Sequence, residues 1–422
     1  MTEWKTYKLG EICNLVAGFA FKSKDFGDFP NKVVKIADIQ PPVVNTNELT
    51  GVDLSNYDTV KLSKYLVSKG DYMLAMTGAT IGKLGRITDD VEAYINQRVL
   101  TFRPNESIVD KDYLYYQLCS LNFNKYILNH IDSETAQPNI SAGSVGGFEI
   151  SLPGLEEQRR IAGVLGAIDD KIENNRRINA NLESQAQALY KQWFVDFEFP
   201  NEEGKPYKSS SGKMVDSELG PIPEGWRVGN IGGYCKIRSG YAFKSSWWTD
   251  RGVKIIKIKN ITENGVLDMS ECSYVDIKHC DKASDFNGHA GDLIIAMTGA
   301  TLGKVCIIPY HTTDYYINQR VGKFFLGDNP INKLPFIHCI LRDENVMSEI
   351  INKGQGSAQP NISASDVETI KIVMPSYYIM DKFNLLLQSN YALWLKNMAE
   401  VNSLATLRDT LLPKLMNGEI KL

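Results

Sequence analysis

The chain carries two copies of one long unit. The segment AQPNIS at Ala136–Ser141 returns unchanged at Ala358–Ser363. Three more segments recur in the same order, at offsets of 221 or 222 residues: GFAFKS at 18 with GYAFKS at 240, MTGAT at 76 and 297, and NQRV at 96 and 318. Self-similarity at this period predicts two domains of one fold, because about 100 to 200 residues suffice for a separate core.

Composition places the chain among soluble globular proteins of the cytoplasm. Of its 422 residues, 43% are hydrophobic and 23% are charged, and neither a membrane span nor an apolar leader is evident. The seven cysteines lack CxxC spacing, which favours reduced thiols. A net charge of −4 argues against binding nucleic acid through bulk positive charge, although a local basic face remains open.

Each copy is expected to be a mostly-β body with one helical stretch, which makes the fold class α/β in the α+β sense. The helical stretches are expected at about 111–129 and 335–352, each shortly before AQPNIS. Alternating or apolar runs predict four strands in each copy. These runs are VVKIADI, YMLAM, RVLTF and FEISL from residues 33, 72, 98 and 148, and VKIIKIKNI, LIIAM, RVGKFF and IKIVM from residues 253, 293, 320 and 370.

A long helical pattern follows each body, after Pro153 and Pro375. In the first copy apolar residues recur at alternating spacings of three and four, which is typical of a coiled-coil seam. The seam positions that we expect to join the two helices are Ile161, Leu165, Ile168, Ile172, Asn175, Leu182 and Leu189, and Phe383, Leu387, Trp394, Asn397, Val401, Leu404 and Leu411. An antiparallel pairing would relate the bodies by a pseudo-twofold axis, and the buried Asn175 and Asn397 would fix the register.

These patterns divide the chain into five parts. The connector is rich in Pro, Gly and Ser, so it is either ordered by contacts or flexible. The parts are a first body at 1–152, a central long helix at 153–199, a connector at 200–225, a second body at 226–374 and a C-terminal long helix at 375–422.

No motif supplies a catalytic centre. The repeats GATIGK at Gly78–Lys83 and GATLGK at Gly299–Lys304 have three residues between their glycines where a phosphate-binding P-loop has four, and neither lysine precedes Ser or Thr. None of the five histidines has a partner at the repeat offset, and no zinc-type cluster occurs. We therefore expect a non-catalytic protein with no cofactor and no metal.

Two copies without a catalyst suggest a two-site binding protein, and duplex DNA suits paired modules at a fixed spacing. The side chains of Gln97, Arg98, Gln319 and Arg320 are of the types that read adenine and guanine edges. Identical residues in both copies can equally hold the shared fold, so both interpretations remain open.

The order of motifs resembles one family over essentially the whole chain, the specificity subunits of type I restriction-modification systems. The stretches that carry the resemblance are LPGLEEQRRIAGVLGAIDDKIE from Leu152, TGATIGK, INQRV, the QPNIS segments, GPIPEGW before the second body and LRDTLLPKLMNGEI from Leu407. One departure is that the second helix opens with YYIMDKFN in place of EEQRRIA, which makes two unequal docking surfaces an expectation.

The resemblance implies a division of labour among subunits. Each body would be a target recognition domain for one half of a split, asymmetric DNA sequence, and the helices would set the unread gap and dock two modification (methyltransferase) subunits. Adenine methylation with S-adenosylmethionine, and cleavage with ATP, would belong to the modification and restriction subunits.

Residues can then be sorted by whether the two copies share them. Shared residues should build the fold or touch phosphate, whereas base-reading residues should differ. The shared candidates for phosphate contact are Lys22, Lys83, Lys244 and Lys304, and the diverged loops are 40–50, 262–271, 130–135 and 353–357. A DNA-independent scaffold and an enzyme with an unfamiliar site between body and helix are the alternatives.

Overall fold

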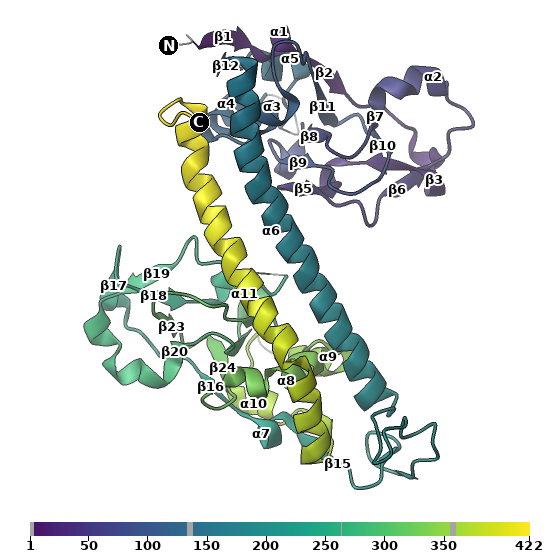
Figure 1. Cartoon of the computed structure of the whole chain (residues 1–422), viewed down its shortest axis with the longest axis vertical. Coiled ribbons are helices and arrows are strands. Elements are labelled where there is room, and N and C mark those ends of the chain that lie inside the picture. The colour runs from purple at the N-terminus through teal and green to yellow at the C-terminus, as the bar shows by residue number, and fades with distance from the viewer. Residues whose placement is uncertain (1–3, 133–137, 263, 355–359) are drawn as a thin grey trace. The chain divides into compact units, whose positions relative to one another are not determined.

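The chain folds into two compact units (Figure 1). A computed structural model describes residues 4–132, 138–262, 264–354 and 360–422. Unit 1 comprises Met1–Asp170 and Ala405–Leu422, and unit 2 comprises Lys171–Leu404. Each unit is a mostly-β body packed against stretches of two long helices, as the sequence predicts. No helix among the described residues has the length and apolar character needed to cross a bilayer.

The body of unit 1 contains three sheets, with strand orders β1-β12, β6-β3-β10-β7 and β2-β11-β8-β9-β5-β4. Its strands are β1 Lys5–Lys8, β2 Cys13–Ala17, β3 Phe26–Val34, β4 Ile39–Gln40, β5 Val43–Val44, β6 Thr50–Val52, β7 Leu66–Val67, β8 Tyr72–Ala75, β9 Leu84–Arg86, β10 Ala93–Ile95, β11 Val99–Pro104 and β12 Glu149–Leu152. Its short helices are α1 Leu9–Ile12, α2 Thr59–Leu62, α3 Lys111–Leu118, α4 Leu121–Asn129 and α5 Ala142–Gly146.

Unit 2 repeats this plan, with sheets ordered β15-β25, β16-β24-β21-β22 and β17-β19-β18-β23-β20 and a hairpin β13-β14 in the connector. Its strands are β13 Met214–Val215, β14 Ile222–Pro223, β15 Arg227–Asn230, β16 Lys236–Ser239, β17 Trp248–Thr249, β18 Val253–Ile256, β19 Ser273–Val275, β20 Asn287–Gly288, β21 Leu293–Ala296, β22 Val305–Ile307, β23 Tyr315–Ile317, β24 Val321–Phe325 and β25 Lys371–Met374. Its short helices are α7 Ile231–Tyr234, α8 Leu334–Leu341, α9 Glu344–Lys353 and α10 Ala364–Glu368.

Two sequence predictions are wrong in detail. Each expected single helix before AQPNIS is a pair of helices, α3 with α4 and α8 with α9. The break occurs where a capping side chain starts a new helix: Ser120 Oγ accepts from the Phe123 amide at 3.3 Å, and Asp343 Oδ1 accepts from the Asn345 amide at 2.9 Å.

The expected strands from residues 33 and 253 also end earlier than predicted. β3 and β18 end at Val34 and Ile256, and a 3-10 turn follows each of them. Side chains close both turns, because Asp38 accepts from the Lys35 amide at 2.7 Å and Asn260 accepts from the Lys257 amide at 2.9 Å.

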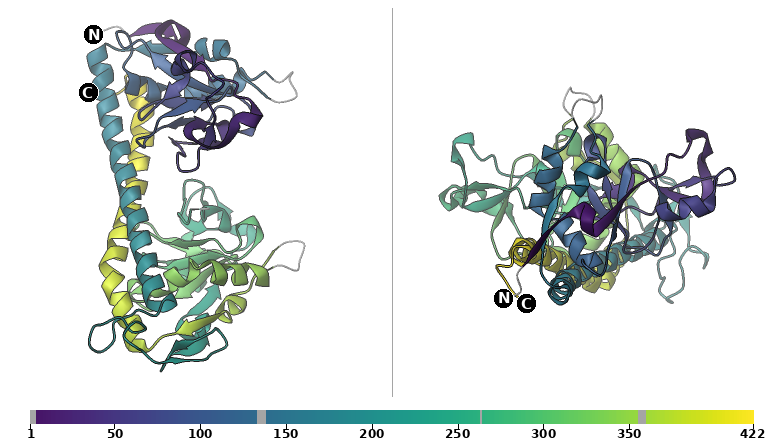
Figure 2. Two further views of the ribbon diagram at one scale, coloured as in Figure 1. Left: turned by 90° about the vertical axis from the view of Figure 1, so that its right-hand side faces the viewer. Right: turned by 90° about the horizontal axis from the view of Figure 1, so that it is seen from above.

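The long helices are α6, Leu155–Tyr190, and α11, Tyr377–Met416. They run antiparallel within each unit: Arg408 pairs with Asp169 at 2.9 Å in unit 1, and Asn397 Nδ2 donates to Asn179 Oδ1 at 2.9 Å in unit 2. The body of each unit lies along one side of its helix pair (Figure 2). Every predicted seam position is buried or half-buried.

The two asparagines expected to fix the register differ in their partners. Asn397 pairs with Asn179, and Asn179 Nδ2 also reaches the Trp394 carbonyl at 3.4 Å. Asn175 donates to Glu400 at 2.8 Å, and its own Oδ1 is buried without a hydrogen-bond partner among the described residues. The register of unit 2 therefore rests on the pair Asn179–Asn397 more than on Asn175.

Different side chains fasten the helix pair to the body in the two units. In unit 1 the Tyr116 hydroxyl donates to Asp169 at 2.8 Å, and this carboxylate also pairs with Arg408. In unit 2 the buried His338 lies 2.9 Å from the Tyr391 hydroxyl through Nδ1. These contacts, half-buried in unit 1 and buried in unit 2, hold helix and body together inside each unit, because an unpaired polar group there would be costly.

The C-terminal residues complete unit 1. Leu415 and Met416 are buried in the same hydrophobic cluster as Leu9, Tyr72 and Leu165. The connector also packs against unit 2: Tyr207 stacks on Phe199 with ring centroids 4.6 Å apart, and Ile222 lies in the unit 2 core. The connector is therefore ordered by its contacts, which resolves the alternatives left open by its composition.

Candidate DNA interface

The four repeated segments meet at one place in unit 2. The Met297 amide donates to the Arg320 carbonyl at 3.0 Å, and the Ile362 amide donates to the Met297 carbonyl at 3.0 Å. The Gly240 amide donates to the Val321 carbonyl at 2.9 Å. These bonds join MTGAT to NQRV, the NIS residues of AQPNIS to MTGAT, and GYAFKS to NQRV.

Unit 1 repeats the same bonds. The Met76 amide donates to the Arg98 carbonyl at 2.9 Å, the Ile140 amide to the Met76 carbonyl at 3.0 Å, and the Gly18 amide to the Val99 carbonyl at 2.9 Å. A Cβ at Gly18 would lie 2.1 Å from the Asn96 carbonyl oxygen, so this crossing accepts only glycine. Part of the repetition therefore has a structural cause.

The segments also enclose a hollow in unit 2. Its volume is about 720 Å³, and it is lined by residues from GYAFKS, MTGAT, NQRV and AQPNIS together with Ser239. Nine of its ten lining residues have an identical counterpart in unit 1, the exception being Ser239 opposite Ala17. Gln319 and Arg320 line it with exposed side chains, and Gln97 and Arg98 are exposed in unit 1 as well.

The predicted phosphate contacts are not all equally accessible. Lys22, Lys83 and Lys244 are exposed, whereas Lys304 is half-buried. Lys22 and Lys244 each stand immediately before a matched 3-10 turn, Ser23–Asp25 and Ser245–Trp247. The Gly-rich segments form 3-10 turns, Gly78–Thr80 and Gly299–Thr301, that begin at glycines with φ of 70° and 73°. Lys83 therefore lies between this tight turn and the start of β9.

A matched lysine–aromatic pair in each unit was missed by the sequence reasoning. Lys35 Nζ lies 4.1 Å from the centre of the Phe26 ring, and Lys257 Nζ lies 3.5 Å from the centre of a Trp248 ring. Burial, and secondarily the Lys259 charge, lowers the pKa of Lys257. Both lysines and both aromatic residues sit at the 222-residue offset, so the repeat itself was the available signal.

Beside each shared lysine, the two units differ. The turn after Lys22 ends in Asp25, whose carboxylate accepts a hydrogen bond from the Tyr57 hydroxyl at 2.5 Å. The matched turn in unit 2 ends in Trp247, which stacks on His279 with ring centroids 4.3 Å apart. The two units thus hold different side chains at one matched position, a buried Asp25 and a half-buried Trp247, although the sequence analysis had placed divergence in other loops. Of those loops, residues 133–135, 263 and 355–357 lie outside the described part of the chain, as do Ala136–Gln137 and Ala358–Gln359 of AQPNIS.

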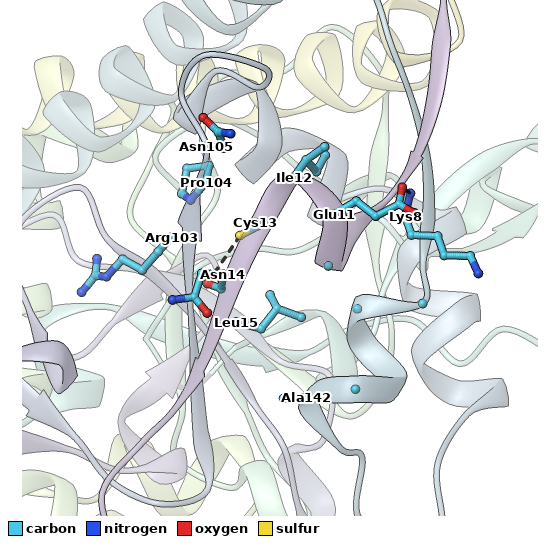
Figure 3. A pocket seen from close by; sticks show the side chains of 14 residues that line it. Lys8, Glu11, Ile12, Cys13, Asn14, Leu15, Arg103, Pro104, Asn105 and Ala142 are labelled. Carbon is cyan, nitrogen blue, oxygen red and sulfur yellow. Dashed lines mark hydrogen bonds between the residues drawn. The ribbon is translucent and has the colours of Figure 1, made fainter.

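A different hollow, of about 810 Å³, lies in unit 1 beside the edge strand β2 (Figure 3). Its lining includes Lys8, Glu11, Arg103 and Gly146. At the position matching Gly146, unit 2 has Glu368, whose carboxylate accepts from the Ile237 amide of the edge strand β16 at 2.7 Å. This hollow mixes both charge signs, and unit 2 has a carboxylate at the place that Gly146 takes in unit 1, so the hollow is a weaker candidate for a function common to both units.

Cysteine and metal chemistry have little support in the part of the chain that the structure describes. All seven cysteines are free, and five of them are buried. Burial raises the pKa of the Cys306 and Cys339 thiols to about 12, which keeps them protonated. Among the described residues, no group of three or more His, Cys, Asp or Glu side chains could hold a metal ion.

Comparison with known proteins identifies a family model and relatives that match most of the chain. The family model described as "Type I restriction modification DNA specificity domain" matches residues 1–184 and 223–392. The chain is 27% identical to the type I restriction enzyme MjaIX specificity subunit of Methanocaldococcus jannaschii, covering 95% of this chain and 96% of that one. It is 25% identical to the HindI specificity subunit of Haemophilus influenzae over the full length of both.

A solved structure shares the fold. The S subunit of a type I restriction-modification system from M. genitalium aligns with a TM-score of 0.57 and 17% identity, covering 98% of this chain and 96% of that one. Because the family model matches most of the chain in two segments, one in each copy of the repeat, the chain belongs to the specificity subunits of type I restriction-modification systems.

Proposed function

We propose that this specificity subunit recognises a bipartite, asymmetric sequence in double-stranded DNA, with each body binding one half. The observation that carries the proposal is the convergence of the four repeated segments in both units, with Gln and Arg side chains exposed at the junction. Shared residues there contact what every half-site has in common, and diverged residues such as Trp247 contribute to the difference between the halves.

The long helices set the unread gap between the two halves. A paired helix is a suitable spacer because its rise of about 1.5 Å per residue is fixed by backbone hydrogen bonds. The buried pair Asn179–Asn397 supports this role, since a polar pair inside a helical seam fixes which residues face each other.

The same helices dock two modification subunits. On α11 an apolar face is exposed, formed by Tyr378, Leu385, Leu386 and Leu393, and the first two are about 70% exposed (70% and 71%). The matched positions on α6 are Glu156, Gly163, Val164 and Lys171. Exposed apolar patches of this kind mark partner surfaces. The difference supports unequal docking surfaces, a mainly apolar one on α11 and a mainly polar one on α6.

The chemistry resides in the partners. S-adenosylmethionine for adenine methylation is bound by the modification subunits, and ATP for cleavage by the restriction subunits. The specificity subunit itself is non-catalytic and holds no cofactor, and its contribution is to bring these subunits to the chosen sequence in the cytoplasm.

Mapping of methylated adenines in the source genome tests the proposal directly. The expected result is a two-part motif with one methylated adenine in each half, and its complete loss when this gene is deleted. A continuous motif, or a split motif that survives the deletion, would contradict the assignment. A DNA-independent scaffold would instead give no shift of duplex DNA even with the modification subunits present, and an enzyme would give turnover by the purified chain.

A further inference from the structure

We infer that the hollow built by the four repeated segments in unit 2 binds one phosphodiester of the DNA backbone through the Arg320 side chain, and that the matched junction in unit 1 binds another through Arg98. This inference rests on the proposed function and assigns a role that sequence analysis had left open, since Gln97, Arg98, Gln319 and Arg320 could have read bases or merely held the fold.

The first argument is charge. Among the ten residues that line the hollow, Arg320 is the single charged one, and the others are small, apolar or neutral polar residues. A cation without a neighbouring carboxylate in the lining favours an anion. The guanidinium group matches phosphate geometry because it offers two parallel N–H donors.

The second argument is a hydroxyl without a partner. Thr298 is only 9% exposed, and its Oγ1 atom is buried without a hydrogen-bond partner among the described residues. Buried polar atoms are rarely left in this state, so a phosphate oxygen in the hollow would supply a partner that the fold itself does not. Thr298 lines the hollow, as do Gln319 and Asn361, so neutral donors accompany the arginine.

The third argument is shape. The bases of intact duplex DNA lie at the floor of grooves and are read by protruding helices, ribbons or loops. A hollow of about 720 Å³ receives a ridge instead. On duplex DNA the ridges are the sugar–phosphate strands.

The fourth argument is repetition. The residues that line the hollow in unit 2 recur in the sequence of unit 1 apart from Ser239 opposite Ala17, although the two halves of an asymmetric target differ in sequence. Identical chemistry can serve both halves only if it contacts an element present in both. A phosphodiester meets this condition for any sequence.

The backbone carbonyl groups of Arg320 and Arg98 already have hydrogen-bond partners within the fold, so only the side chains of these residues are available to bind a phosphate. The Arg320 and Arg98 carbonyl oxygens accept from the Met297 and Met76 amides, so the backbone of each arginine is fixed within the fold. Each exposed side chain is therefore presented from a rigid base, and substituting it should leave the fold intact.

The test uses the full chain assembled with its modification subunits, and a duplex carrying the target found by methylation mapping. We expect Arg320→Ala and Arg98→Ala each to weaken binding to target and non-target duplexes by the same factor. Each should also reduce the slope of log Kd against log salt by about 0.9, the value for one released counterion. Arg320→Lys should keep the salt slope, and Arg227→Ala, an exposed arginine of β15 outside the hollow, should leave both quantities unchanged.

A second measurement locates the phosphate. Duplexes with one neutral methylphosphonate at a time should reveal a position in one half-site where neutralisation weakens binding by the wild-type complex but not by Arg320→Ala. Thr298→Val should weaken binding about fivefold, as expected for one lost hydrogen bond, with no change of salt slope.

The inference is overturned if Arg320→Ala relaxes the preference for a particular base pair, or if its salt slope equals that of the wild type. Failure of the proposed function looks different, because the wild-type complex would then prefer no duplex at all. Melting curves of each variant exclude unfolding as the cause.

Discussion

In Arg98 and Arg320, residues shared by both units, the backbone holds the fold while the side chain stays available for a ligand. The backbone of each arginine closes the junction of the repeated segments, whereas each side chain is exposed. Sequence analysis had treated these roles as alternatives. Their separation into backbone and side chain could not be foreseen, because the pairing of MTGAT with NQRV joins residues about 20 positions apart through the sheet.

At the same scale, His338 makes unit 2 sensitive to acid. Burial, with the Arg342 charge adding to it, lowers the pKa of His338 to about 3, against about 6.5 in an unfolded chain. Between these values the unfolded state binds one more proton, so the free energy of unfolding decreases as the pH falls through this window. The expected slope from this residue approaches about 1.4 kcal/mol per pH unit well inside the window.

Urea unfolding at several pH values between 7.5 and 5 measures this loss of stability. Tryptophan fluorescence is a suitable signal because Trp394 contacts His338 with ring centroids 5.2 Å apart. The variant His338→Gln should be less stable at pH 7.5 and should lose less stability on acidification. Parallel pH profiles for variant and wild type would contradict the assignment.

At the scale of elements, periodicity carried most of the information. The three-four spacing predicted which positions of α6 and α11 are covered, from Ile161 to Leu411, because one helix face must be buried. The breaks at Ser120 and Asp343 were missed because a cap in the middle of an apolar run leaves the helical period almost unchanged. The hollow was missed for another reason: no periodic pattern encodes which loops meet.

The pair Asn179–Asn397 is expected to be coupled. Asn179→Leu should lower the stability of unit 2 by about 1–3 kcal/mol, since it leaves the buried Asn397 amide without its partner. Replacing both residues by Leu should recover most of this loss. A double-mutant cycle by urea unfolding gives the coupling energy, and additive effects would show that the hydrogen bond does not matter.

The apolar face of α11 gives a separate prediction about docking. The double substitution Leu385→Ser with Leu386→Ser should weaken binding of one of the two modification subunits at least about tenfold, through loss of buried apolar area. Thermal stability should hardly change, because both side chains are exposed. Titration followed by native mass spectrometry reports the stoichiometry.

Leu128→Ser provides the matched control, since Leu128 is an exposed leucine on α4 of the body. If the double variant still binds two modification subunits with unchanged affinity, this face of α11 is not part of the docking surface.

At the scale of the whole molecule, the length of the two long helices should determine the length of the unread DNA between the half-sites. One heptad inserted into each of α6 and α11, after Asp170 and after Leu404, preserves the seam and adds about 10 Å. That length equals about three base pairs at 3.4 Å each. Methylation mapping should then find both half-sites unchanged and the gap longer by about three base pairs. An unchanged gap would mean that something other than helix length sets it.

Unit 1 is built from two stretches of the chain that are synthesised far apart in time. Unit 2 is one continuous stretch, Lys171–Leu404, whereas unit 1 needs Ala405–Leu422 to supply Leu415 and Met416 to its core. The first body therefore lacks this part of its core until all of unit 2 has been synthesised, and the apolar side chains that Leu415 and Met416 cover stay uncovered during that time.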